Sequence, residues 1–179
     1  MKGWSFVLHN FLCNVFQVLL IYNFFQTAKA AAFDPTEPVV ELRIQAMKAC
    51  FKGTKRVYIH AESIQQIVDI IDFAQAFALP FPVIVGGDEA HLVGPKLKDS
   101  KIPVMLNRIH SLPRHEDDLT YQPFRLPALL KAQGILFCLQ NDGDMQAMNT
   151  RNLPFQAGTT MAYGLSEEEA LQTVSLNVC

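Results

Sequence analysis

Side chains that bind metals or exchange protons follow four short apolar runs in the sequence. His60 ends the first run, Arg108 and His110 follow the third, and Asp142 follows the fourth. Histidine and aspartate bind divalent metals and transfer protons. An arginine guanidinium donates two parallel hydrogen bonds to a carboxylate. These four residues form a site only if the chain brings the ends of the runs together.

The apolar runs alternate with helical patterns, and this alternation predicts how the candidates are positioned. We expect strands at residues 56–60, 83–85, 102–106 and 135–139. We expect helices at residues 42–50, 64–77, 88–97, 124–132, 153–163 and 167–174. Apolar strands that alternate with helices form a parallel sheet, either doubly wound or part of a closed (β/α) barrel. No Gly-x-Gly-x-x-Gly follows any of these strands, so nothing supports dinucleotide binding.

The carboxyl ends of parallel strands share one edge of the sheet, and active sites of such folds lie there. This rule predicts that His60 and Asp142 lie at the same end. Each also has a structural interpretation, since a lone histidine is more often structural and turns favour aspartate. Of the other histidines, we expect His91 on a helix surface and His115 in a solvated loop.

Composition excludes several classes of protein. Half of the 179 residues are hydrophobic, 18% are charged, and the formal net charge is −2, so there is no basic field for nucleic acid. Four cysteines show no Cys-x-x-Cys spacing: Cys13, Cys50, Cys138 and Cys179. They are interpreted as thiols, with Cys50 and Cys138 buried, and not as a disulfide framework or a structural zinc site.

Residues 1–33 form an apolar N-terminal segment, and residues 34–179 form the expected barrel domain. No charged residue lies between Lys2 and Lys29, and residues 6–25 are strongly apolar. Three interpretations stay open: a secretory signal, a membrane span, or a helix of the barrel. A signal would place the protein outside the cytoplasm, in the periplasm for example, and otherwise it is cytoplasmic. We expect a helix from about residue 15 to 31 whose apolar face drives self-association or membrane contact.

The strand motifs resemble those of amidohydrolases related to imidazolonepropionase. Val57-Tyr58-Ile59-His60-Ala61-Glu62 is similar to the fifth strand of that family. Residues 83–90 resemble the sixth strand, residues 102–106 with 110–113 the seventh, and residues 136–142 the eighth. Residues 151–158 and 163–171 resemble the segment that follows the eighth strand. The likeness covers roughly residues 24–177 as an ordered set.

This resemblance implies that the chain forms strands five to eight, about half of a TIM-type barrel. It also implies metal-dependent hydrolysis of a C–N bond in a small cyclic amide or peptide-like substrate. The divalent metal, zinc by preference, would be bound by His60 and Asp142. Asp142 would also act in catalysis by carrying a proton, and Arg108 and His110 would hold the substrate.

The sequence also departs from the family pattern. The first-strand His-x-His is absent, and Gly86-Gly87 stands where many relatives have the sixth-strand histidine. Two ligands are fewer than a zinc site needs. We therefore expect a truncated chain that is inactive alone and binds no metal. The alternatives are a non-catalytic half-barrel that binds a ligand, and a membrane-anchored interaction module that uses residues 6–25.

Overall fold

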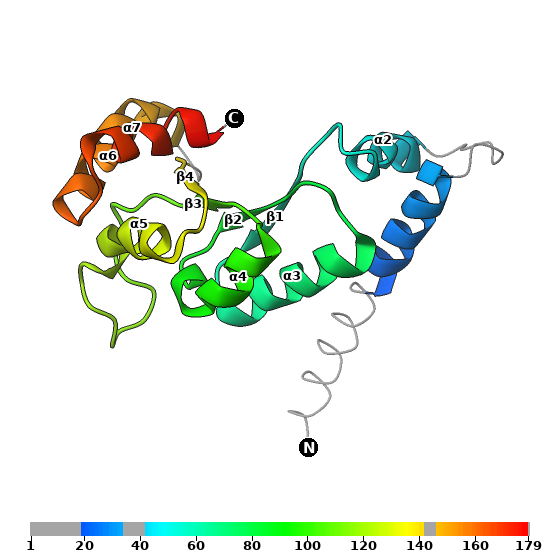
Figure 1. Ribbon diagram of the computed structural model, residues 1–179, viewed down its shortest axis with the longest axis horizontal. Coiled ribbons are helices and arrows are strands. Elements are labelled where there is room, and N and C mark those ends of the chain that lie inside the picture. The colour runs from blue at the N-terminus through cyan, green and yellow to red at the C-terminus, as the bar shows by residue number, and fades with distance from the viewer. Residues whose placement is uncertain (1–18, 34–41, 142–145, 179) are drawn as a thin grey trace, which may run out of the picture. The chain divides into compact units, whose positions relative to one another are not determined.

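The computed structural model describes residues 19–33, 42–141 and 146–178, which contain a four-stranded parallel sheet (Figure 1). The strand order is β1-β2-β3-β4. The strands are β1 (Val57–Ala61), β2 (Pro82–Gly86), β3 (Val104–Leu106) and β4 (Phe137–Leu139). The predicted α/β class and sequential parallel order are confirmed, consistent with part of a TIM-type barrel.

The chain divides into two compact units, residues 1–56 with 76–81, and residues 57–75 with 82–179. In the first unit, residues 19–33 are helical and α2 spans Leu42–Phe51. Phe25 contacts Phe51 and Phe77 edge-on, with ring centroids 6.1 and 5.6 Å apart. The predicted helix of residues 15–31 is confirmed from residue 19, and its earlier part lies outside the described residues. No helix in the described ranges has both the length and the hydropathy to cross a membrane.

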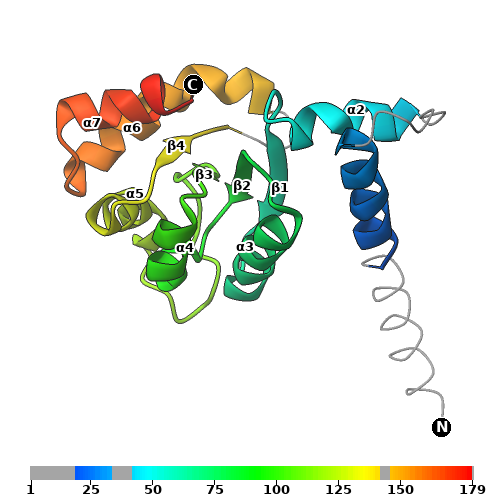
Figure 2. The same cartoon turned by 45° about the vertical axis from the view of Figure 1, so that its right-hand side comes forward.

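The second unit holds the sheet and the helices that follow each strand. Helices α3, α4 and α5 lie along one side of the sheet (Figure 2). The elements after β1 are α3 (Ile64–Phe77), η1 (Ala90–Val93), α4 (Gly94–Ser100), α5 (Gln122–Gln133), η2 (Gln146–Asn152), α6 (Leu153–Ala162), α7 (Glu167–Thr173) and η3 (Leu176–Val178). The expected helix at 88–97 is instead a 3-10 turn followed by a short α-helix, because Gly94 and Pro95 interrupt the pattern.

Strand register separates the two faces of the sheet. Ile59 pairs with Ile84, Ile84 with Val104 and Val104 with Phe137, so this row shares one face. Ile84 and Val104 are completely buried. The neighbouring row contains His60, Val85, Met105 and Cys138 and therefore points to the opposite face. This row carries the histidine that the sequence selects.

Gly86 and Gly87 make the turn after β2. Their φ angles are +109° and +73°, which side chains rarely adopt. A Cβ on Gly86 would lie 2.7 Å from the Ala61 carbonyl oxygen, and one on Gly87 would lie 2.6 Å from Val104 Cγ1. The Gly87 N–H donates to that same Ala61 oxygen at 2.7 Å. The two glycines are therefore required by the backbone conformation of this turn. This requirement does not depend on whether relatives have a metal-binding histidine here.

Candidate functional site

Three of the predicted site residues, His60, Arg108 and His110, lie at or just after the carboxyl ends of strands. His60 is the fourth of five residues in β1 and is exposed. Arg108 and His110 follow β3 and are also exposed. Asp142 lies outside the described residues, so its position beside His60 stays a prediction.

His110 is directed toward α5 and α6. Its Nε2 lies 2.8 Å from Thr159 Oγ1, and its ring meets Phe124 edge-on at 5.8 Å. Arg108, in contrast, lines a pocket. The two residues expected to hold a substrate together therefore have different surroundings.

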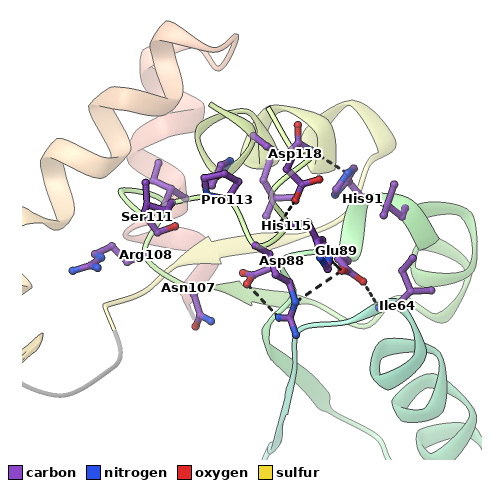
Figure 3. A pocket seen from close by; sticks show the side chains of 17 residues that line it. Ile64, Asp88, Glu89, His91, Asn107, Arg108, Ser111, Pro113, His115 and Asp118 are labelled. Carbon is purple, nitrogen blue, oxygen red and sulfur yellow. Dashed lines mark hydrogen bonds and ion pairs between the residues drawn. The ribbon is translucent and has the colours of Figure 1, made fainter. Parts of the chain in front are cut away.

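A pocket of about 330 Å³ lies beside the ends of β2 and β3 (Figure 3). Its polar lining residues are Asp88, Glu89, His91, Asn107, Arg108, Ser111, Arg114, His115, Asp118 and Gln122. Leucine, isoleucine and proline side chains complete the wall. Neither His60 nor His110 is among the described residues that line it. The volume is that of a site for a small ligand.

Arg114 interacts with three carboxylates at one side of this pocket. It is hydrogen-bonded to Glu62, and its guanidinium nitrogens lie 3.7 Å from Asp88 Oδ2 and 3.9 Å from Glu89 Oε1. Burial raises the pKa of the Asp88 carboxyl, and the nearby Glu62 charge raises it further, whereas Arg114 opposes the rise. The surroundings of Asp88 therefore disfavour its ionised form.

Glu89 joins three of the loops at the sheet edge. Its Oε2 accepts from the Ile64 N–H at the start of α3, at 2.7 Å. Its Oε1 lies 2.7 Å from His115 Nε2. Its own N–H donates to the Glu62 carbonyl at 3.1 Å. The hydrogen bond with His115 lowers the pKa of Glu89 most, and the hydrogen bond from Ile64 lowers it further. The hydrogen bond with Glu89 raises the pKa of His115.

His91 is not the surface residue that the sequence predicts. It is half-buried, and burial lowers its pKa. Gln122 Nε2 lies 3.1 Å from His91 Nε2 and donates to the neutral ring, while Gln133 Nε2 donates to the His91 carbonyl at 2.8 Å. Both glutamines come from α5, which covers η1 in the tertiary structure.

A second polar network ties the β3 loop to the end of β4. Gln156 of α6 is 1% exposed; its Oε1 accepts from the Ile109 N–H at 3.0 Å and its Nε2 donates to Asn141 Oδ1 at 2.8 Å. Gln140 Nε2 donates to Asn107 Oδ1 at 2.8 Å. Sequence reasoning missed Gln156, and the only local signal was a glutamine between apolar positions of a helix.

The described residues do not by themselves fit a metal site. Among them, no three His, Cys, Asp or Glu side chains lie close enough together to hold a metal ion. Structural and catalytic zinc sites use at least three protein ligands. His60 would need Asp142 and further ligands to hold a metal ion.

Comparison with known proteins identifies one related architecture. No family model and no curated protein sequence matches the chain. A solved structure, an amidohydrolase from Thermotoga maritima MSB8, matches with a TM-score of 0.63 and 23% sequence identity. The match covers 98% of this chain and 43% of that protein. The chain has an amidohydrolase-like fold.

The amidohydrolase-like fold explains why polar side chains collect at one edge of the sheet. In barrels of this type, the loops after the strands build the site. The match spans less than half the length of the Thermotoga protein. It therefore bears on the fold alone.

Proposed function

We propose that the chain provides strands five to eight of an amidohydrolase barrel of the imidazolonepropionase-like branch, and that the barrel hydrolyses a C–N bond. The observation that carries this proposal is the match of four sequential parallel strands to part of an amidohydrolase. The motif around His60, at the carboxyl end of β1, supports the finer assignment to strand five. A small cyclic amide or peptide-like molecule is the substrate class.

The proposed roles follow the strand ends. His60 and Asp142 are metal ligands, and Asp142 also carries the proton to the leaving nitrogen. Arg108 holds a substrate carboxylate from the pocket wall, and His110 orients the substrate from its position against Thr159. Because two ligands do not make a zinc site, we propose that these 179 residues alone bind no zinc tightly and are inactive.

Isothermal titration of zinc tests this proposal on the wild-type chain and on His60→Ala and Asp142→Ala. The exposed Asp117→Ala is the matched control. We expect no stoichiometric, tight binding in any of the four proteins. Tight binding by the wild type that is lost in His60→Ala would show that other residues complete the ligand set, and would contradict the inactive half-barrel.

The hydrolase assignment has its own test. A His-x-His encoded upstream of Met1 would supply the first-strand ligands. The longer protein should then hydrolyse cyclic amides or N-acyl amino acids with zinc present. His60→Ala and Asp142→Ala should abolish that activity and leave the circular dichroism spectrum unchanged. Hydrolysis that survives both substitutions would contradict the proposed roles.

A second candidate function is ligand binding without catalysis. The observation that favours it is a pocket whose described lining excludes His60 and whose charged groups bind one another. Such a pocket needs no metal. Screening metal-free protein against small molecules by thermal shift, with His60→Ala beside the wild type, separates the two functions. Stabilisation that is equal in both proteins favours the binding role.

A further inference from the structure

Residues 111–118, here called the strap, line one side of the pocket between β3 and α5. Six strap residues line the pocket: Ser111, Leu112, Pro113, Arg114, His115 and Asp118. Any movement of the strap therefore changes access to the pocket. This holds whether or not the protein is a hydrolase, and it requires neither His60 nor a metal.

The strap is held by charge and not by apolar burial. Leu112 is 84% exposed, so its side chain does not hold the strap in place by burial. The backbone hydrogen bonds donated by Ser111 and Asp118 run to Ile109 and His115, within the same loop.

The strap's long-range contacts come from two adjacent side chains, Arg114 and His115. They reach Glu62 after β1, and Asp88 and Glu89 after β2. A segment fastened in this way depends on the ionisation of its anchors.

We propose that the strap is a pH-sensitive closure over the pocket and that the His115–Glu89 pair is its titrating contact. The ionisable groups that face this pair are Glu62 from the β1–α3 turn, Asp88 from the β2–η1 turn, His91 from η1, and Arg114 and Asp118 from the strap itself. Arg114 stays charged at every accessible pH. Protonation of His115 therefore sets how firmly the strap is held in the neutral range.

The direction of the pH effect follows from the two shifts. Pairing with Glu89 raises the pKa of His115 from 6.5, so its contribution is complete below that value and is lost as pH rises through the raised pKa. Pairing lowers the pKa of Glu89 from 4.5, so its contribution is complete above that value. The strap is therefore held most firmly between pH 4.5 and pH 6.5, the ordinary pKa values of glutamate and histidine. It opens more often in mildly alkaline solution.

Hydrogen–deuterium exchange measured by mass spectrometry tests the closure. Exchange of peptides that cover the strap is compared at about pH 6 and about pH 8.5, on either side of the histidine transition, after correction for the intrinsic rate. The proteins are wild type, His115→Gln, Glu89→Gln and the control Glu116→Gln, an exposed carboxylate on the same strap. Glu89→Gln keeps an oxygen that can accept from Ile64.

In the wild type we expect strap protection to fall about two- to fivefold between the two pH values, the range of an exposed ion pair. His115→Gln and Glu89→Gln should give low protection that no longer depends on pH, while Glu116→Gln should behave as wild type. Peptides of β3 and α5 report whether each variant is folded. Equal wild-type protection at both pH values would overturn the proposal without any variant, and so would a pH dependence that persists in folded His115→Gln.

Discussion

Gln156 shows how a single buried amide can fix two loops. Both of its polar atoms are bonded, to the Ile109 backbone and to Asn141, and its side chain is almost fully buried. Asn141 directly precedes Asp142, and Ile109 lies between Arg108 and His110. Gln156 therefore positions the chain just before Asp142 and between Arg108 and His110.

Gln156→Leu should lower the free energy of unfolding by about 1–3 kcal/mol, because it removes two hydrogen bonds and leaves buried partners unpaired. Urea denaturation measures this loss. The control is Gln65→Ala, an exposed position on α3, which should change stability by less than about 0.5 kcal/mol. A Gln156→Leu protein as stable as wild type would show that water or neighbouring groups satisfy Ile109 and Asn141.

The sequence identified strand-end residues but not their partners. His60 and Arg108 were selected by a rule that needs only the chain direction of a parallel strand. Arg114 binds Glu62 at 52 positions away, His115 binds Glu89 at 26, and Gln156 binds Ile109 at 47. No local sequence pattern indicates these partners. His91 was misjudged for the same reason, since its burial comes from glutamines on α5.

At the scale of elements, the turn after β2 leaves little room for a side chain beside the pocket. Gly87 combines a left-handed φ of +73° with a Cβ position that would lie 2.6 Å from Val104 Cγ1. Asp88 and Glu89 follow immediately, so this turn sets where both carboxylates enter the pocket. The side chain of Val104 is completely buried and has little freedom to move aside.

Gly87→Ala should therefore destabilise the protein by about 1–3 kcal/mol through backbone strain and the contact with Val104. Gly158→Ala is the matched control, because it lies within α6, with no heavy atom within 4 Å of its Cβ position. It should leave stability unchanged or raise it by up to about 1 kcal/mol. Thermal unfolding of the two variants, followed by circular dichroism, gives the comparison. Equal melting temperatures would contradict the assigned role of Gly87.

The elements themselves were largely predictable from the sequence, because each is encoded locally. The apolar run of β2 and the isoleucine spacing of α3 give the correct element types and nearly the correct bounds. The Ser166–Glu169 capping box and Gly134 likewise mark where α7 begins and α5 ends. The path of the strap was not predictable, since its position depends on carboxylates from two other loops.

At the scale of the whole molecule, β1 leaves large side chains uncovered, whereas every residue of β2 and β4 is buried. Tyr58 is 53% exposed and His60 is exposed, both on alternate positions of β1. In a closed eight-stranded barrel, inward-facing side chains fill the interior in layers. These exposed positions of β1 are consistent with the proposal that the strands belong to a larger barrel.

The helix of residues 19–33 leads to the last prediction, which concerns association. Leu19, Leu20, Ile21 and Tyr22 are 54%, 52%, 53% and 41% exposed, and adjacent apolar side chains of this kind favour burial against another surface. We expect the purified chain to self-associate through this helix. The double substitution Leu20→Ser and Ile21→Ser should weaken association by about 3 kcal/mol or more, the transfer free energy of two such side chains.

Size-exclusion chromatography with light scattering, over a range of protein concentrations, measures this association. Leu171→Ser on α7 removes a similarly exposed leucine, 59% exposed, from a helix outside this segment, and should leave the distribution unchanged. The comparison is informative because both changes reduce surface hydrophobicity, yet only one alters the adjacent apolar group. A wild-type chain that remains monomeric at every concentration would contradict the prediction. An equal effect of Leu171→Ser would assign the association to nonspecific hydrophobic contacts.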